Sequence, residues 1–237
     1  MQASWDIPPR RYPFLDAIDA AISELGIESF ASLDNGAVYG EQAFYAMNQP
    51  RISRGALADV RPTRARDQLL NAIEIASEFP GLRVIDGDAL TETAAAEIGE
   101  VDAVFLLNVL LHAVAPDWDA VLDLYAAQTA CFVIAQPQWE GSGETVRLHE
   151  LGRERYIEAM PPAIASSGVI DRLGDWYPAQ QRPMRDARTL WQWGITDADL
   201  ERKLEHLGFD LVDRRDLGAF QGTEAFSTRT FVFGRPG

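Results

Sequence analysis

The run Val101-Asp102-Ala103-Val104-Phe105-Leu106-Leu107 is apolar at nearly every position. Strands buried on both faces of a parallel sheet have this near-continuous hydrophobicity, whereas strands with one face in water alternate apolar and polar residues. The run therefore predicts a buried strand of a parallel sheet. Such a sheet needs helical crossovers between its strands, so the surrounding sequence is expected to supply helices.

Strands and helices alternate along the chain on both sides of this run. The predicted strands are at 29–33, 55–60, 82–85, 101–107 and 130–135, and the predicted helices are at 14–25, from about 41, from 63 and from 117. Five strands that alternate with helices predict an α/β fold with a doubly wound, mostly parallel sheet covered on both faces.

The C-terminal region adds two strands with a different connection. Thr196 is placed to cap a helix that ends at Gly208, and strands are predicted at 209–212 and 230–233. No helical pattern separates these two strands, so an antiparallel pair is expected. Residues 137–193 lack a regular pattern and are rich in Trp, Tyr, Pro and Arg, which predicts a lid inserted into a single domain over 1–237.

Composition and charge narrow the class of partner. The chain has 237 residues, and its formal net charge of -15 repels phosphate backbones. Its basic clusters, such as Arg10-Arg11, are too small to suggest a nucleic-acid groove, so a small-molecule partner is expected. No apolar run approaches the ~18–20 residues of a membrane helix, and the first residues lack a signal-peptide pattern. These features favour a cytoplasmic protein that neither spans nor binds a membrane.

The single cysteine, Cys131, lies in the apolar run predicted as the fifth strand. One cysteine forms no disulfide within the chain, and its apolar neighbours predict burial rather than a catalytic thiol. No Cys/His cluster or group of close carboxylates has the spacing of metal ligands, so no metal is predicted.

Polar residues follow the first three predicted strands. The segment Asp34-Asn35-Gly36-Ala37-Val38-Tyr39-Gly40 follows the first strand, Asp59 ends the second, and Asp86-Gly87-Asp88 closes the third. Glycines in the first segment let the backbone approach a ligand closely. Asp59 is placed to accept hydrogen bonds from ribose hydroxyls. Taken singly, the glycines also fit an ordinary strand-to-helix turn and Asp59 a solvated loop.

These segments resemble the motifs of class I S-adenosylmethionine-dependent methyltransferases. The region from Val101 to the run Asn108-Val109-Leu110-Leu111-His112 is also similar to that family, as is the C-terminal strand pair. The resemblance covers most of the chain outside the lid. It implies a Rossmann-like sheet whose last strand inserts antiparallel beside the parallel strands, with S-adenosyl-L-methionine as cofactor and an oxygen or nitrogen of a small molecule as methyl acceptor.

The same resemblance implies roles for individual residues. Asp88 would bond the adenine amino group while the backbone of Ala89 reads a ring nitrogen, and Leu107 and Asn108 would lie beside the methionine part of the cofactor. The implied cofactor-binding residues are Asp34, Gly36, Ala37, Tyr39, Gly40, Asp59, Asp88, Ala89, Leu107 and Asn108.

Two histidines are candidate bases for a hydroxyl acceptor, namely His112 after the fourth strand and His149 in the lid. A histidine on an apolar segment such as that of His112 is also commonly a satisfied core residue. His149, Arg153, Tyr156, Trp176, Tyr177 and Trp191 are predicted either to build an aromatic pocket over the acceptor or to form the core of the lid itself. The third histidine, His206, is predicted to be exposed.

Two other functions fit parts of the sequence. A nicotinamide-dependent oxidoreductase has the same α/β alternation, but its fingerprint places glycines first, third and sixth, whereas Gly36 and Gly40 are first and fifth. A non-catalytic binding protein with the methyltransferase fold is also compatible with Asn35 and with Val38, which stands where the family usually has its middle glycine.

Overall fold

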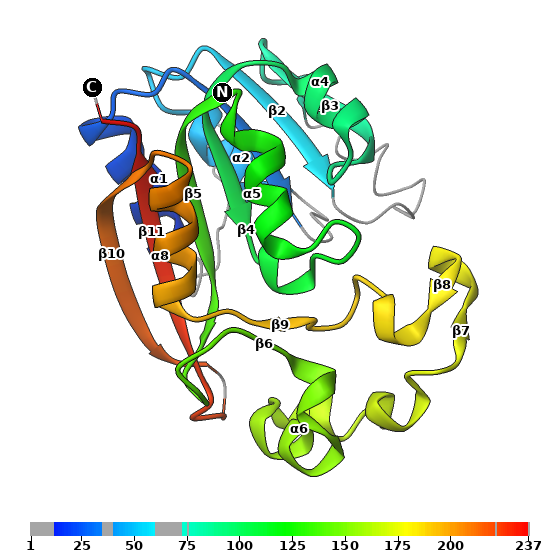
Figure 1. Ribbon diagram of the computed structural model, residues 1–237. Coiled ribbons are helices and arrows are strands. Elements are labelled where there is room, and N and C mark those ends of the chain that lie inside the picture. Colours follow the sequence, from blue (N-terminus) through cyan, green and yellow to red (C-terminus); the bar gives the residue numbers. More distant parts are fainter. Residues whose placement is uncertain (1–11, 35–39, 60–72, 75, 221, 237) are drawn as a thin grey trace.

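A central seven-stranded sheet carries helices on both faces and an irregular segment beyond one end (Figure 1). The computed structural model describes residues 12–34, 40–59, 73–74, 76–220 and 222–236. The strands of the sheet are β1 (Ser29–Asp34), β2 (Arg54–Asp59), β3 (Leu82–Asp88), β4 (Val101–Leu107), β5 (Thr129–Trp139), β10 (Asp210–Ala219) and β11 (Phe226–Gly234). Their order is β10-β11-β5-β4-β1-β2-β3.

The first five strands are parallel, as the alternation predicts, and β4 lies between β1 and β5. Successive residues of β4 point to opposite faces, so its apolar run fills two cores. Val104 and Leu106 belong to one buried cluster, whereas Phe105 and Leu107 belong to the other. This is why the run is apolar at nearly every position. The predicted doubly wound fold is confirmed.

Each face of the sheet is covered by its own set of helices. Buried residues of α1 (Tyr12–Glu24) and α2 (Glu41–Met47) pack in the cluster that contains Phe105. Those of α4 (Glu92–Ile98), α5 (Trp118–Ala126) and α8 (Asp197–His206) pack in the cluster that contains Val104. The helix predicted from Thr63 lies largely outside the described residues.

The two C-terminal strands form the predicted antiparallel pair. β11 pairs antiparallel with both β10 and β5, so the later strand of the pair lies between the earlier one and the parallel strands. The predicted cap of α8 is also present, because the Thr196 hydroxyl accepts a hydrogen bond from the Asp199 amide at 3.2 Å. His206 is exposed, as predicted.

Strand β5 corrects one predicted boundary. It continues to Trp139, whereas the sequence predicts an end at Ala135 and a lid from residue 137. The extension exists because β11 pairs with β5 as far as Phe226 opposite Trp139. Cys131 is buried in this strand, as predicted, and burial raises the pKa of its thiol to about 12. The thiol is therefore protonated at neutral pH.

The segment predicted to be a lid, called the lid below, consists of short elements packed around a third apolar cluster. This cluster includes Leu148, Tyr156 and Met160 together with Trp139 and Phe226 from the ends of β5 and β11. The elements after β5 are β6 (Val146–Arg147), η3 (Leu148–Leu151), α6 (Arg153–Ala159), α7 (Pro162–Ala165), η4 (Val169–Arg172), β7 (Trp176–Tyr177), η5 (Pro178–Gln180), β8 (Arg182–Pro183), η6 (Met184–Asp186) and β9 (Trp193–Gly194).

The lid is tied together where it leaves and rejoins the sheet. The Thr145 amide donates to Asp199 Oδ2 at 2.8 Å, and the Thr196 amide donates to the Thr145 hydroxyl at 3.1 Å. Burial alone would raise the pKa of Asp199, but hydrogen bonds from Thr145, Thr196 and Arg202 outweigh it and lower that pKa to about 2. Asp199 therefore keeps its charge at neutral pH and holds both ends of the lid.

Candidate functional site

Three acidic residues meet at the carboxyl ends of neighbouring parallel strands. The register of the strands places the Cα of Asp34 opposite that of Asp59, and Asp59 opposite Asp88. On its other side, Asp34 lies opposite Leu107 of β4. Residues predicted from separate motifs are therefore brought to one edge of the sheet. Open α/β sheets bind their ligands at this edge.

The backbone around Asp59 is tied to the end of β3. Asp59 is only 3% exposed, and its carbonyl oxygen accepts a hydrogen bond from the Ala89 amide at 3.0 Å. The resemblance assigns this amide to a ring nitrogen of the cofactor. Because this amide already donates to a backbone carbonyl, it can donate to a ring nitrogen only by giving up that bond. The role of Ala89 stays a prediction.

The glycine segment is described only at its two ends. Gly36, Ala37 and Tyr39 lie outside the described residues, and Asp34 is described only by its place in β1. Gly40 has a φ of +58°, and a Cβ atom there would lie 2.7 Å from Leu57 Cδ2. Both the left-handed backbone and the close side chain require glycine at this position.

The residues after β4 bend sharply toward the lid. Asn108 adopts a φ of 56°, a left-handed conformation that asparagine tolerates better than most residues, and its amide donates to the Ala135 carbonyl at 2.7 Å. The short helix η2 (Leu110–His112) follows directly. His112 is 8% exposed, and its Nδ1 lies 2.7 Å from the carbonyl oxygen of Leu190 in the lid.

The contact with Leu190 has a chemical consequence for His112. A carbonyl only accepts, so Nδ1 carries the hydrogen, and in the neutral ring Nε2 is then the basic nitrogen. The contact fits the reading of His112 as a satisfied core residue, and it also assigns the tautomer that a base acting through Nε2 needs. The catalytic role of His112 stays a prediction.

His149 lies in η3 of the lid and is half-buried. Burial lowers the pKa of its imidazole below 6.5, and the positive charge of Arg147 lowers it further. The side chain is therefore mostly neutral at pH 7, which is the state required of a general base. Its catalytic role also stays a prediction.

The protonation of His149 is directly measurable. In an NMR titration of the full chain, its imidazole Cε1–H resonance is expected to have a midpoint below pH 6.5, because burial and Arg147 both disfavour the charged ring. The spectrum of His149→Asn identifies the resonance by its disappearance. A midpoint at or above 6.5 would contradict this environment.

The aromatic residues of the lid differ in their burial. Tyr156 and Trp191 pack in the apolar cluster of the lid, where Trp191 contacts Phe226 with ring centroids 5.0 Å apart. Trp176, by contrast, is 57% exposed. Tyr156 and Trp191 therefore fit the alternative of a lid core, whereas the role of Trp176 in a pocket stays a prediction.

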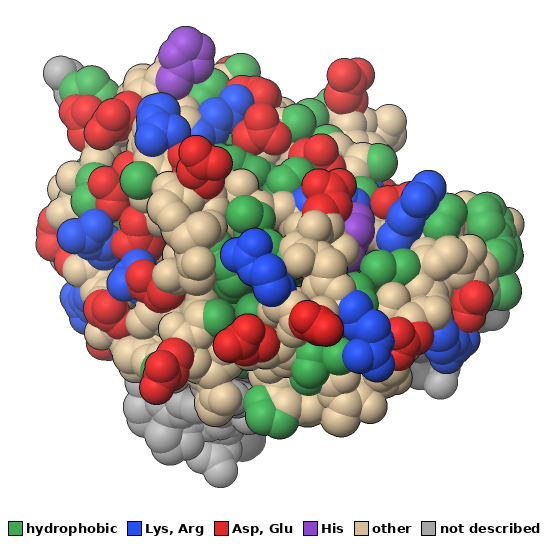
Figure 2. Space-filling model, turned by 60° about the horizontal axis from the view of Figure 1, so that its bottom comes forward, with side chains coloured by type: hydrophobic (Ala, Val, Ile, Leu, Met, Phe, Trp, Pro, Cys, Tyr) green, Lys and Arg blue, Asp and Glu red, His purple; other side chains and the backbone are tan. Residues whose placement is uncertain are grey.

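The surface of the lid is dominated by paired charges. Arg153 donates to Asp171 at 2.8 Å, and Arg172 donates to Asp175 at 3.0 Å. Figure 2, in which the lower end of Figure 1 comes forward, shows acidic and basic side chains interspersed over the described part of this face. Arg153 therefore serves a surface ion pair rather than a pocket.

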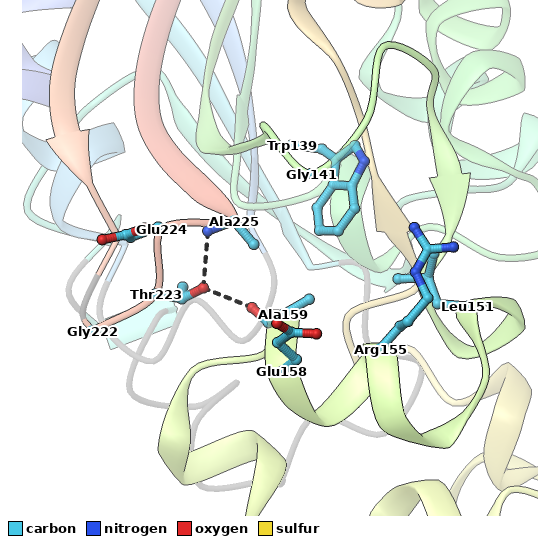
Figure 3. Close-up of a pocket in the computed structure, with 10 residues that line it drawn as sticks. All are labelled: Trp139, Gly141, Leu151, Arg155, Glu158, Ala159, Gly222, Thr223, Glu224 and Ala225. Carbon is cyan, nitrogen blue, oxygen red and sulfur yellow. Dashed lines mark hydrogen bonds between the residues drawn. The ribbon is translucent and has the colours of Figure 1, made fainter.

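A cavity of about 510 Å³ lies between α6 and the turn that joins β10 to β11 (Figure 3). The ring of Trp139 and the side chains of Arg155 and Glu158 line it, whereas Glu224 points away from Trp139. The Thr223 hydroxyl donates to the Ala159 carbonyl at 2.8 Å and accepts from the Ala225 amide at 3.1 Å. This pair of bonds joins the lid helix to the turn.

Gly141→Ala is expected to disturb the wall of this cavity. A Cβ atom at Gly141 would lie 2.3 Å from Cζ2 and 2.4 Å from Cη2 of Trp139, whose ring is buried and packs on Phe226. Overpacking of this kind costs about 1–3 kcal/mol of unfolding free energy. Chemical denaturation followed by tryptophan fluorescence measures the loss. Gly143→Ala, where a Cβ atom meets nothing within 4 Å, is the control and is expected to change little.

One lid residue contacts the predicted cofactor edge without having been predicted from the sequence. Arg188 is 1% exposed, and its Nη1 donates to Asp88 Oδ1 at 2.6 Å. Its Nε and Nη2 donate to the carbonyls of Val114 and Ala115 at 3.2 and 2.8 Å. A single arginine in an irregular segment gives no signal in the sequence. Only the fold brings it to β3.

The part of the chain that the structure describes contains neither a metal-binding cluster nor a membrane-spanning helix. Among the residues that the structure describes, no cluster of three or more His, Cys, Asp or Glu residues is arranged to hold a metal ion. Within the same residues, no helix has both the length and the apolar character needed to cross a membrane.

The fold is similar to that of several solved proteins. The N-terminal domain of EvdMO1 with S-adenosylhomocysteine bound has 18% identity and a TM-score of 0.58, with 94% of this chain and 81% of that chain covered. The 1,6-didemethyltoxoflavin-N1-methyltransferase of Burkholderia thailandensis has 13% identity and a TM-score of 0.57, with 95% and 79% covered. The magnesium protoporphyrin IX methyltransferase of Synechocystis PCC 6803 has 12% identity and a TM-score of 0.52, with 98% and 89% covered.

Sequence comparison adds no family. No protein-family model matches the chain, and no curated protein matches it in sequence. At these identities the similarity to solved structures establishes the fold and leaves the chemistry to be argued from the site. The chain has the fold of class I S-adenosylmethionine-dependent methyltransferases, as the resemblance in its sequence predicts.

Proposed function

We propose that this chain is a methyltransferase that uses S-adenosyl-L-methionine and methylates an oxygen or nitrogen of a small molecule. The observation that carries the proposal is the alignment of Asp34, Asp59 and Asp88 across three neighbouring strand ends. Carboxylates at these ends suit a ligand that offers hydroxyl and amine donors, as an adenosine does. Structures with this fold bind S-adenosylhomocysteine, including the toxoflavin and magnesium protoporphyrin enzymes.

The proposed cofactor lies along the carboxyl ends of β1 to β4. Asp59 accepts from the ribose hydroxyls and Asp88 from the adenine amine, and residues of the 34–40 segment are also proposed to bind the ligand. Leu107 lies opposite Asp34 at the end of β4. Leu107 and the following residue, Asn108, are proposed to contact the methionine part. Asn108 suits this place because its left-handed backbone turns the chain away from the sheet edge.

When bound, the cofactor supplies an electrophilic methyl group on a sulfonium. The task of the protein is then to align the acceptor with that carbon and to exclude water, and no covalent enzyme intermediate is required. The lid is proposed to provide the enclosure. A hydroxyl acceptor also has to lose its proton, and His112 and His149 are the candidate bases, the latter mostly neutral at pH 7 for the reasons given above.

Alanine variants test the two histidines separately. If one of them removes the acceptor proton, its replacement is expected to lower kcat by about 100-fold or more, since general-base catalysis contributes roughly 10²–10⁴. Single-turnover methyl transfer over a pH series measures the effect once an acceptor is known. Unchanged turnover in both His112→Ala and His149→Ala would eliminate both as bases.

A small-molecule acceptor is supported by the formal net charge of -15, which disfavours the phosphate backbone of a nucleic acid. The Burkholderia enzyme with this fold holds 1,6-didemethyltoxoflavin, and the acceptor of the present chain is proposed to be a molecule of comparable class rather than a nucleic acid.

Calorimetric titration of the full chain tests the proposed cofactor. S-adenosylmethionine and S-adenosylhomocysteine are expected to bind, whereas NADH and NADPH are not. Binding of the nicotinamides alone would favour the oxidoreductase alternative. Binding of none of the four would leave a non-catalytic protein with the methyltransferase fold, an alternative that is compatible with Asn35 and Val38.

A further inference from the structure

Arg188 is placed in the lid but reaches the end of β3. Its side chain is 1% exposed, and three of its nitrogens donate hydrogen bonds in three directions, to the Val114 and Ala115 carbonyls and to Asp88 Oδ1. The Gln180 side chain fixes the arginine backbone by accepting from its amide at 2.9 Å. A planar guanidinium held at several points has little freedom to move, so Arg188 is a rigid contact between lid and sheet.

The contact acts on one oxygen of the Asp88 carboxylate. Oδ1 accepts from Arg188 at 2.6 Å and from the Leu90 amide at 3.0 Å, whereas no hydrogen bond from a described residue reaches Oδ2. The Asp88 side chain is 20% exposed, so it is not sealed off. With one oxygen held on two sides, the rotation of the carboxylate is set, and the other oxygen keeps its capacity to accept.

We propose that Arg188 is a positioning residue that orients Asp88 to accept the exocyclic amine of adenine through Oδ2. The proposal rests on the function proposed above. It makes the lid part of the site that selects the base of the cofactor. A carboxylate oriented in this way favours an amino group at that place and disfavours a carbonyl oxygen, so adenine is selected over hypoxanthine.

A purely structural role for Arg188 makes a different prediction. If Arg188 only anchors the lid, its replacement lowers the stability of the lid. The affinities for all ligands beneath the lid then fall by the same factor. An arginine that orients Asp88 affects the preference between an amine and a carbonyl on the base. The ratio of two affinities therefore separates the roles, whereas a single affinity does not.

The experiment is calorimetric titration of the full chain with S-adenosylhomocysteine and S-inosylhomocysteine, which differ in that amine. The wild type is expected to bind the adenine compound about 10- to 100-fold more tightly. This is the ratio of affinities that one hydrogen bond to a charged group typically provides. Arg188→Met is expected to reduce this ratio to about 3 or less. In the double variant with Asp88→Asn and Arg188→Met, the ratio is expected to fall little further than in either single variant. The reason is that each change alone already disrupts the Arg188–Asp88 pair.

Arg147→Met is the matched control. Arg147 is also a largely buried lid arginine, and it pairs with Asp186 and lies over the ring of Trp193, but it forms neither a hydrogen bond nor an ion pair with Asp88. Its replacement is expected to keep the wild-type ratio even if both affinities fall. A ratio reduced equally in Arg147→Met would overturn the proposal, because lid disruption alone would then explain the result.

Two further outcomes decide the proposal. If Arg188→Met does not fold, Arg188→Lys takes its place, because an ammonium on a flexible stem cannot reproduce the three-way geometry and is expected to lower the ratio about threefold or more. An unchanged ratio in a folded Arg188 variant overturns the inference and leaves the proposed function standing. A wild type that binds neither compound overturns the proposed function, and this inference with it.

Discussion

Replacing Asp59 with alanine is expected to weaken the binding of S-adenosylhomocysteine by about 100-fold. Asp59 ends β2, is 3% exposed and lies opposite Asp34 at the proposed cofactor edge of the sheet. A carboxylate there accepts two hydrogen bonds from ribose hydroxyls in the proposed complex. Hydrogen bonds to charged groups contribute roughly 1.5–3 kcal/mol, and a loss of about 2.7 kcal/mol corresponds to 100-fold in affinity.

Calorimetric titration measures the loss, and two variants control for it. Asp59→Asn keeps the shape of the buried side chain and is expected to lose less affinity than Asp59→Ala. Comparing the two variants separates the effect of the charge from that of the packing. Asp123→Ala removes a carboxylate of α5 whose Oδ1 accepts from Lys203 Nζ at 2.6 Å, and it is expected to leave the affinity unchanged. If Asp59→Ala kept the thermal midpoint of the wild type and bound within threefold of it, the ribose assignment would be wrong.

Phe105→Ala is expected to be the most damaging single change in the sheet. Phe105 is fully buried in β4, and its ring stacks on that of Phe30 with centroids 4.9 Å apart and planes at 5°. Truncation of a buried phenylalanine costs about 3–5 kcal/mol, through lost burial and the cavity left behind. Because a whole domain is stable by only about 5–15 kcal/mol, this loss brings the chain close to unfolding.

Urea denaturation followed by circular dichroism measures this free energy. Phe105→Leu keeps most of the apolar volume and is expected to lose much less, about 1–1.5 kcal/mol. Phe30 is held in place on its other side by Gly55, where a Cβ atom would lie 2.6 Å from the ring. The cavity left by the Phe105→Ala truncation is therefore not expected to collapse readily. A loss below 1 kcal/mol for Phe105→Ala would show that the ring stack relaxes.

The strands of the sheet are predictable from the sequence because burial dictates their composition. The 101–107 run is apolar on both faces, and β4 is covered on both faces. Boundaries are less predictable where pairing extends a strand beyond its apolar residues. Gln136, Pro137 and Gln138 do not read as a strand, yet they belong to β5 because β11 lies beside them.

Some residues of the candidate site are likewise predictable from the sequence, and others are not. Asp34, Asp59 and Asp88 are predictable as a group, because parallel strands of a doubly wound sheet end at one edge. Arg188 is not, because it is 100 positions from Asp88 in the chain and lies in a segment without periodicity. The packing of Tyr156 and Trp191 into a lid core depends on contacts with the ends of β5 and β11, and no local pattern reveals such contacts.

The position of β11 in the sheet also bears on the order in which the protein is completed during synthesis. β11 lies between β5 and β10 and joins β10 to the rest of the sheet. Because β11 follows β10 in the chain, β10 is synthesised before it has a partner strand. Until β11 is synthesised, the outer edge of β5 is open, with Phe132 and Ile134 among its apolar side chains. A nascent chain halted just after β10 would therefore expose an unpaired strand edge that is prone to association with other chains.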